Sequence, residues 1–291
     1  MFKRRSRNAT CAKRSDAGRF AGAPAAVILA ACIAPAAALF AAFWLLPMAR
    51  LATLPATKGW ATYFAVLTEP RYLTSLVQTT LLSAAVTLVA LLLAAAVGLY
   101  LGRRSFIGKR LLISALTMPL AFPGVIVGFF VILLGGRQGA IAAWSEALTG
   151  TRITFAYGLA GLFLAYVYFS LPRAIVAFTA AAEAMGDELE DAARSLGAGR
   201  GWIARDVWLP ALAPTAMAVG AILFATAMGA FGTAFTLSSR FEVLPITIYN
   251  EFTNYANFAL AASLSIALGV ITWLALFAAR RFGPATAAGG A

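Results

Sequence analysis

The acidic residues of this 291-residue chain are few and unevenly placed. Six of the eleven fall within residues 183–206: Glu183, Asp187, Glu188, Glu190, Asp191 and Asp206. A cluster of acids, or a nucleophile beside a base, is what a membrane phosphatase or protease needs. The chain has no histidine, and its cysteines, Cys11 and Cys32, show no partner spacing. His-based triads and His metal ligands are therefore excluded, and we expect no catalytic residue, metal or cofactor.

The cluster is predicted to form a short helix from Glu188 to Leu196. Four residues at i, i+3, i+4 and i+7 make a narrow apolar stripe with small residues at its centre: Leu189, Ala192, Ala193 and Leu196. One interpretation is a surface offered to a partner, and the other is an ordinary amphipathic loop at the membrane surface. The alanines favour a partner, because a helix resting on lipid gains more from Leu, Phe or Trp.

Both ends of this helix carry capping signals. Asp187 stands at the N-cap with Glu190 three residues on, which predicts a capping box. Arg194 follows Glu190 by four residues in the stabilising order. Gly197 falls where a C-cap glycine is expected, and a second short helix should follow the glycine turn.

The surrounding composition is that of a membrane protein, with 62% hydrophobic residues, 12% charged residues and a mean hydropathy of +0.84. Six windows lack any charged residue: 20–49, 72–102, 111–136, 153–172, 207–239 and 252–279. A helix needs about 20 apolar residues to cross a bilayer, so each window holds one span. We therefore expect an all-α integral membrane protein of six transmembrane helices, with the acidic loop between the fourth and fifth.

Basic residues in alternate loops predict the orientation. Seventeen lie on the side that holds the acidic loop and six on the other, so by the positive-inside rule both termini are cytoplasmic. The count places Arg173 in the cytoplasmic loop, and a fourth helix that runs past Arg173 is the open alternative, because the ends of this span are the hardest to set. The arm 1–23 is interpreted as an orientation signal near anionic lipid rather than a nucleic-acid site. A cleaved signal peptide is the open alternative to a retained first span.

The windows contain no ionisable side chain of the kind that ion-coupled carriers keep inside the bilayer. The chain also lacks a nucleotide-binding loop, so this subunit cannot hydrolyse ATP. Most hydroxyls in the windows should bond to helix backbone or neighbouring helices. Pro119 and Pro123 should bend the third helix, and Gly232, with the Ala225/Gly229 pair, should let another helix approach closely.

The acidic loop resembles the EAA loop of binding-protein-dependent ABC importer permeases of the type I, MetI-like group. That motif is Glu-Ala-Ala, three residues, Gly, nine residues, Ile, one residue, Leu-Pro. The spacing matches throughout, with Asp in place of Glu and Val in place of Ile: Glu190, Asp191, Ala192, Ala193, Gly197, Val207, Leu209 and Pro210. The proline-glycine pattern at 118–124 adds to the resemblance, which covers residues 72–279.

The resemblance implies a permease subunit rather than an enzyme, with those eight residues coupling it to ATP hydrolysis in a partner. The implied partners are a cytoplasmic ABC ATPase dimer, a second permease subunit in a homo- or heterodimer, an extracytoplasmic solute-binding protein and the lipid bilayer, with no nucleic acid. The implied location is the bacterial cytoplasmic (inner) membrane. The expected organisation is a basic cytoplasmic arm at 1–23, a first transmembrane helix and external loop at 24–71, the permease domain at 72–279 and a cytoplasmic tail at 280–291.

The loop after the fifth window and the general layout are most similar to the spermidine/putrescine group. The expected cargo is thus a small polar solute such as a polyamine or 2-aminoethylphosphonate. Glu242 and Glu251 are interpreted as solvated loop residues rather than a cation attractor. The alternative function is a secondary carrier or channel not driven by ATP.

Overall fold

The computed structural model describes residues 25–238 and 241–282, with side chains from residue 33 onward. It divides into two compact units, Met1–Leu51 and Ala52–Ala291. The predicted arm at 1–23 and most of the tail at 280–291 lie outside the described residues.

The first unit is helical wherever the structure describes it. Helix α1 (Ala25–Phe40) continues through a π turn (Ala41–Leu45) into α2 (Leu46–Thr53), and the side chains at 33–50 are exposed. The segment Ile33–Lys58 is long and apolar enough to cross a membrane.

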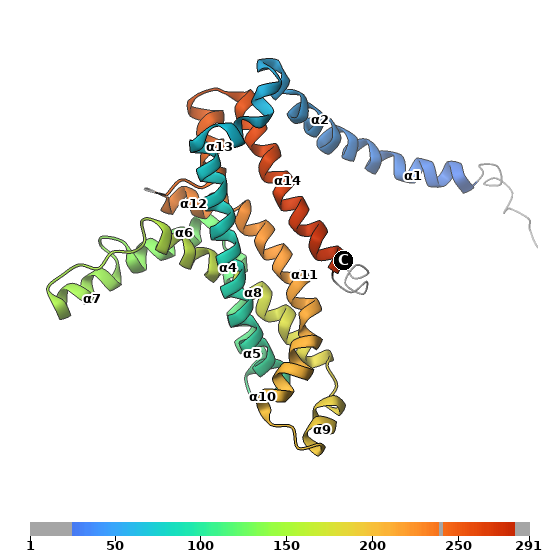
Figure 1. Cartoon of the computed structure of the whole chain (residues 1–291), viewed down its shortest axis with the longest axis vertical. Helices are drawn as coiled ribbons and strands as arrows, with labels where there is room; N and C mark the ends of the chain where they lie inside the picture. The colour runs from blue at the N-terminus through green and yellow to red at the C-terminus, as the bar shows by residue number, and fades with distance from the viewer. Residues whose placement is uncertain (1–24, 239–240, 283–291) are drawn as a thin grey trace, which may run out of the picture. The chain divides into compact units, whose positions relative to one another are not determined.

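The second unit contains the remaining helices (Figure 1). The α-helices are α3 (Ala65–Thr68), α4 (Pro70–Arg103), α5 (Lys109–Thr117), α6 (Gly124–Gly135), α7 (Ala140–Thr149), α8 (Leu159–Ala184), α9 (Glu188–Ser195), α10 (Arg200–Ile203), α11 (Leu209–Met228), α12 (Phe231–Leu237), α13 (Leu244–Tyr249) and α14 (Phe258–Phe282). Short 3-10 turns (η2, Pro55–Lys58; η3, Trp60–Phe64; η4, Met118–Ala121) and π turns (η5, Ala204–Trp208; η6, Asn250–Asn254) connect them. With Ile33–Lys58, six segments of the described chain can span a membrane, as the six windows predict.

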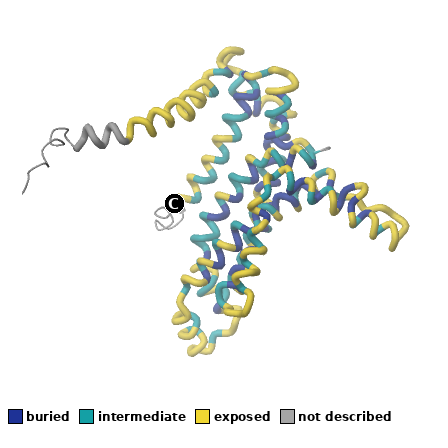
Figure 2. Tube along the Cα trace, turned by 180° about the vertical axis from the view of Figure 1, so that it is seen from behind, coloured by how far each residue is buried: buried dark blue, intermediate teal, exposed yellow. Residues whose placement is uncertain are grey.

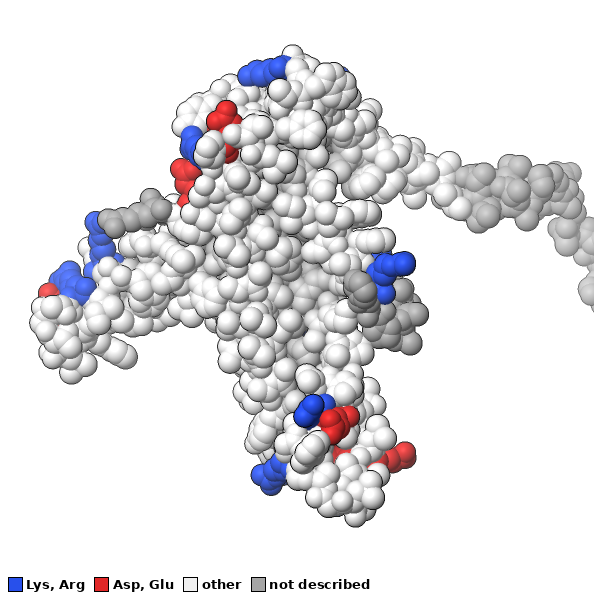
Figure 3. All heavy atoms as spheres, viewed as in Figure 1, with Lys and Arg blue, Asp and Glu red and all other residues white. Residues whose placement is uncertain are grey.

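The core of this unit is formed by α4, α8 and α11, and α14 packs along α11 (Figure 1). Helix α4 can approach α8 closely because two glycines of α4 lie against α8. A Cβ on Gly98 would lie 2.5 Å from Cβ of Phe178, and one on Gly102 would lie 2.4 Å from Cβ of Ala182. The buried residues form apolar clusters along these helices (Figure 2). Charged side chains instead gather at helix ends, leaving the long flanks uncharged on the face shown in Figure 3.

The third window is interrupted rather than bent. Helix α5 ends at Thr117, a 3-10 turn carries Pro119, and α6 begins after Pro123. Neither proline offers an N–H for the helical ladder, so two prolines four residues apart end one helix and begin another. The segment that meets the length and composition of a span is accordingly Gly124–Thr149, which extends through α7.

The fifth window is also interrupted, at Gly229 and Ala230, between α11 and α12. The glycine prediction holds in part. Gly232 lies against α6, where its Cβ would meet Cγ2 of Val125 at 3.0 Å, whereas a Cβ on Gly229 would meet only its own helix, at the carbonyl of Ala225.

The fourth helix is longer than its window. Helix α8 continues through Pro172 and Arg173 to Ala184. The placement of Arg173 in the cytoplasmic loop was therefore wrong, and the alternative of a fourth helix that runs past Arg173 is confirmed. The expectation that no ionisable side chain lies within a span was also wrong. The fourth window, 153–172, stops before Arg173 because a window was defined as free of charged residues. Residues 174–182, directly after Arg173, are again uncharged.

Most hydroxyls in the long helices bond to backbone, as predicted. Thr80, Thr226, Ser265 and Thr272 each donate to the carbonyl four residues earlier, at 2.7–2.8 Å. Three buried hydroxyls, Ser83 Oγ, Thr87 Oγ1 and Thr179 Oγ1, have no hydrogen-bond partner in the described structure.

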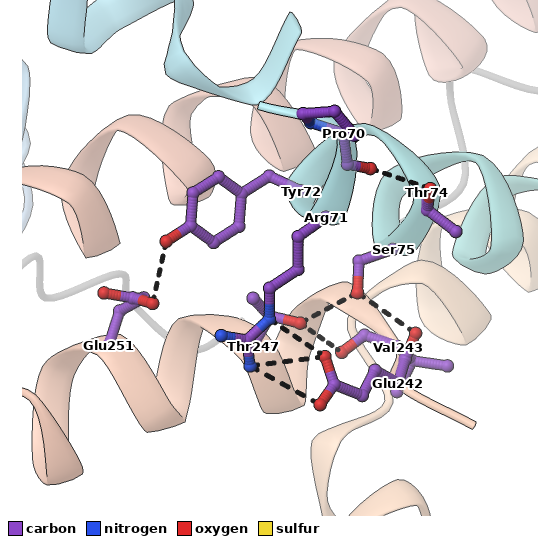
Figure 4. Close-up of polar contacts among 9 residues, drawn as sticks. All are labelled: Pro70, Arg71, Tyr72, Thr74, Ser75, Glu242, Val243, Thr247 and Glu251. Atoms are coloured by element: carbon purple, nitrogen blue, oxygen red, sulfur yellow. Dashed lines mark hydrogen bonds and ion pairs between the residues drawn. The ribbon is translucent and has the colours of Figure 1, made fainter. Parts of the chain in front are cut away.

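A polar network joins the start of α4 to α13 and η6 (Figure 4). Glu251 is only 4% exposed and accepts a 2.9 Å hydrogen bond from the Tyr72 hydroxyl. Arg71 pairs with Glu242 at 3.4 Å. The prediction of a solvated carboxylate is confirmed for Glu242, whose side chain is half exposed, and was wrong for Glu251, which is buried against Tyr72.

Deeper in this network lie two hydroxyl contacts. The Ser75 and Thr247 hydroxyls are 2.8 Å apart, and Thr79 Oγ1 accepts a 2.7 Å hydrogen bond from the backbone N–H of Leu244. We call the part of the second unit that holds this network the α13 end, and the opposite part the α9 end.

Candidate functional site

The eight residues of the predicted coupling loop lie at the α9 end, on α9, the turn after it, η5 and the start of α11 (Figure 1). Glu190 is largely buried, with a side chain 12% exposed, and Ala193 and Val207 are half-buried. The other five residues are exposed: Asp191, Ala192, Gly197, Leu209 and Pro210.

Helix α9 spans Glu188–Ser195, one residue shorter than predicted, and Asp187 precedes it. The capping box does not form, because the Asp187 side chain makes no capping hydrogen bond. Both acids of the predicted box point to other partners: Asp187 bonds Arg103, and Glu190 accepts a 2.5 Å hydrogen bond from Arg194. The i,i+4 pair was thus correct and the capping box was wrong.

The C-terminal prediction is confirmed. Gly197 has φ +81°, a conformation that disfavours side chains with a Cβ. Its N–H bonds the carbonyl of Arg194 at 2.9 Å, and the N–H of Ala198 bonds the carbonyl of Ala193 at 3.0 Å. This pair of bonds is a Schellman motif, so the chain turns sharply after α9 and enters α10.

Helix α9 is held against the long helices through Arg103, the last residue of α4. The Arg103 guanidinium donates to Asp187 and lies 3.7 Å from Glu190 Oε2. The indole Nε1 of Trp208 donates to the same Glu190 oxygen at 3.3 Å. We call Arg103, Asp187, Glu190 and Trp208 the anchor. A cavity of about 740 Å³ adjoins it, lined also by Arg104, Arg194 and Arg200.

The apolar stripe faces outward from this anchor. Leu189 is 65% exposed and Leu196 is 88% exposed, with Ala192 exposed between them. The described chain therefore leaves these side chains open to solvent. A helix that is fixed by charge pairs on one side and exposes leucines on the other has the arrangement expected of a docking surface.

Sequence reasoning missed two features of the molecule. Arg103 and Trp208 were not connected with Glu190, because their contacts join residues 87 and 18 positions away. Arg173 was assigned to a loop although a window admitting one charge would have run from 153 to 182. No group of three or more His, Cys, Asp or Glu side chains in the described residues could hold a metal ion.

Comparison with known families gives a match over residues 94–287 to the family described as binding-protein-dependent transport system inner membrane component. The chain belongs to this family. It is therefore a permease subunit of an ABC importer, a multi-pass protein of the bacterial inner membrane and not an enzyme. Such a permease implies an ATPase and a binding protein as partners.

Curated relatives of this permease include the molybdenum transport system permease protein ModB of Escherichia coli K12. It is 33% identical over 234 residues, which cover 75% of this chain and 99% of the relative. The sulfate transport system permease protein CysT of the same strain is 29% identical over 255 residues, covering 82% and 90% of the two chains. These relatives do not support the expected similarity to the spermidine/putrescine group.

Solved structures agree on the fold. A chain of a bacterial alginate ABC transporter, in complex with an alginate pentasaccharide-bound periplasmic protein, matches with a TM-score of 0.77 and 16% identity. The match covers 91% of this permease and 96% of that chain.

Proposed function

We propose that the α9 end of this permease is its coupling surface, seated on a cytoplasmic ATPase, and that both termini of the chain face the cytoplasm. The observation that carries the proposal is the exposed stripe on α9 above the anchor, because force applied to the stripe reaches α4 through Arg103 and α11 through Trp208. The eight residues that match the EAA pattern supply the helix, its turn and the start of α11.

The permease works as one of a pair, with a second copy or a related subunit, and receives its cargo from an extracytoplasmic binding protein. Its cargo is a tetrahedral oxyanion of the molybdate or sulfate class, in place of the polyamine or aminophosphonate expected from sequence. The support is the set of relatives named for molybdenum and sulfate transport. Glu242 pairs with Arg71 and Glu251 is buried against Tyr72, which agrees with a cargo that is not cationic.

The test is uptake by the intact complex of permease pair, ATPase and binding protein in proteoliposomes. Labelled molybdate, sulfate and spermidine are supplied with ATP inside, and in parallel with a non-hydrolysable analogue. We expect uptake of an oxyanion only with hydrolysable ATP. Equal uptake without ATP hydrolysis would indicate a secondary carrier or channel, and uptake of spermidine would overturn the proposed cargo.

A further inference from the structure

Arg173 lies deep within the membrane-spanning part of the second unit. It stands fourteen residues after the first residue of α8 and eleven before the last, roughly 21 and 16 Å along the helix axis. A hydrocarbon core is about 30 Å thick, so this guanidinium lies near its middle. Among the four long helices α4, α8, α11 and α14, Arg173 is the only charged residue away from a helix end.

Among the described residues the Arg173 side chain has one polar partner, and that partner is uncharged. Its Nη1 donates to Thr226 Oγ1 of α11 at 3.3 Å. No carboxylate of the described chain lies within 4.0 Å of it, whereas Arg71, Arg103 and Arg152 all have such a partner. An unpaired guanidinium at this depth is costly, and arginines retained there mark pathways or bound ligands by default.

A cavity of about 230 Å³ lies beside this contact, where α11 gives way to α12. Helix α8 contributes Tyr166, Phe169 and Ser170 to its lining. Arg173 follows these residues at the spacing i+7, i+4 and i+3, so it shares their face of α8 one turn further along. Thr226, which accepts the Arg173 hydrogen bond, also lines the cavity.

The remaining walls of the cavity are uncharged. Thr233 Oγ1 donates to the carbonyl of Gly124 at 3.0 Å, and the Tyr166 hydroxyl donates to the carbonyl of Ala230 at 2.7 Å. No carboxylate lines this cavity. Thr226 Oγ1 likewise donates to the carbonyl of Ile222 at 2.7 Å, so these three hydroxyls have no free proton to offer a solute. The charged donor near this cavity is the Arg173 guanidinium, one turn away, and a single positive charge there suits an oxyanion and repels a cation.

We propose that Arg173, positioned by Thr226, forms an intramembrane binding site for a divalent tetrahedral oxyanion, at which the cargo pauses during passage through the permease. The site rests on the proposed function, because it presumes a permease whose cargo is anionic. Its guanidinium replaces hydration that the oxyanion gives up, and its single contact with Thr226 leaves further N–H donors for the ligand.

The primary test is ATP-dependent uptake of labelled molybdate and sulfate by the reconstituted complex carrying Arg173→Gln, Arg173→Lys or, as a control, Arg152→Gln. Arg152 pairs with Glu146 on a half-exposed surface. We expect Arg173→Gln to lower uptake about tenfold or more, Arg173→Lys to retain an intermediate rate, and the control to match the wild type. Copurification of the ATPase reports that each variant assembles. Wild-type uptake by an assembled Arg173→Gln complex would overturn the site.

A second pair of variants leaves Arg173 in place. Thr226→Asp supplies an internal carboxylate that neutralises the arginine, and Thr226→Asn is its uncharged counterpart of the same size. We expect the Asp variant to lose oxyanion uptake and the Asn variant to keep most of it, and equal uptake by both would contradict the site even if Arg173→Gln fails to assemble.

The two proposals can fail separately. If the wild-type complex showed no ATP-dependent uptake of an oxyanion, the proposed function would be wrong. ATP-dependent uptake that is insensitive to Arg173 and Thr226 removes only the intramembrane site.

Discussion

The two ends of the second unit differ in what their polar contacts stabilise and in what they leave exposed. At the α13 end the side chains satisfy one another: Glu251 is 4% exposed and bonded to Tyr72, and Ser75 meets Thr247. At the α9 end the Arg103–Glu190 pair is largely buried, while Leu189 and Leu196 remain exposed on the same short helix.

This difference concerns the two polar networks, since the α13 end also exposes aromatic residues such as Phe252 and Tyr255. The α13 network uses its hydrogen-bonding groups internally, so it stabilises the start of α4 without needing a partner. The α9 end fixes a short helix firmly and leaves its apolar side uncovered, which gains free energy only when another protein covers it. Substitutions at the α9 end should therefore change coupling, and those at the α13 end should change stability.

The largest effect is expected for Gly197→Asp. A Cβ at Gly197 would meet no atom within 4 Å, so the variant should insert and fold, but its side chain would project into a docked ATPase. We expect ATP-dependent uptake to fall about tenfold or more, equivalent to about 1.4 kcal/mol of coupling.

The matched control for this variant is Gly150→Asp. Gly150 ends α7 with φ +70° and equally open surroundings, so it imposes the same backbone strain away from α9. If both variants copurify with the ATPase and transport at the wild-type rate, the assignment of the coupling loop is wrong.

The next effect concerns the anchor. Arg103→Met removes the cation that Asp187 and Glu190 share and leaves Glu190 with Arg194 and Trp208 alone. We expect a loss of about 1–3 kcal/mol in stability, measured by thermal unfolding in detergent, and severalfold slower uptake. Lys109→Met is the control, because it breaks the 2.7 Å pair with Glu183 at the same end without touching α9. An equal loss of uptake in both would show that the anchor has no special role.

A smaller effect, confined to stability, is expected for Glu251→Ala. The variant leaves the Tyr72 hydroxyl and the Asn257 amide without the carboxylate that accepts their hydrogen bonds. We expect the free energy of unfolding, measured by thermal unfolding, to fall by about 1–2 kcal/mol. Uptake should still depend on ATP hydrolysis as in the wild type. If Glu251→Ala abolished ATP-dependent uptake but left stability unchanged, the claim that the α13 end affects stability rather than coupling would be wrong.

The smallest effect is expected for Arg71→Gln. Arg71 and Glu242 are about half exposed and 3.4 Å apart, so solvent screens their attraction. We expect a change below about 1 kcal/mol in unfolding and no change in uptake. A larger loss would show that this pair, rather than the buried Glu251, organises the α13 end.

Much of this architecture could be predicted from the residues. Charge-free windows identify six spans because a bilayer excludes charge, and Gly197 marks the end of α9 because its positive φ favours glycine. The interruptions at Pro123 and Gly229 could not be told from kinks, since a window shows only composition. The anchor could not be predicted because it joins residues that are far apart in the sequence. Glu190 does not form the predicted capping box, and Arg103 at the end of α4 lies beside it instead.

The central claim, that the exposed side of α9 docks on the ATPase, is tested most directly by photo-crosslinking in the assembled, transporting complex. The photoreactive residue p-benzoylphenylalanine replaces Leu196, which is 88% exposed, and in a control replaces Trp144 on α7, which is 71% exposed. The account predicts a covalent adduct with the ATPase from position 196 and none from position 144. Active transport without an ATPase adduct at position 196 would contradict it.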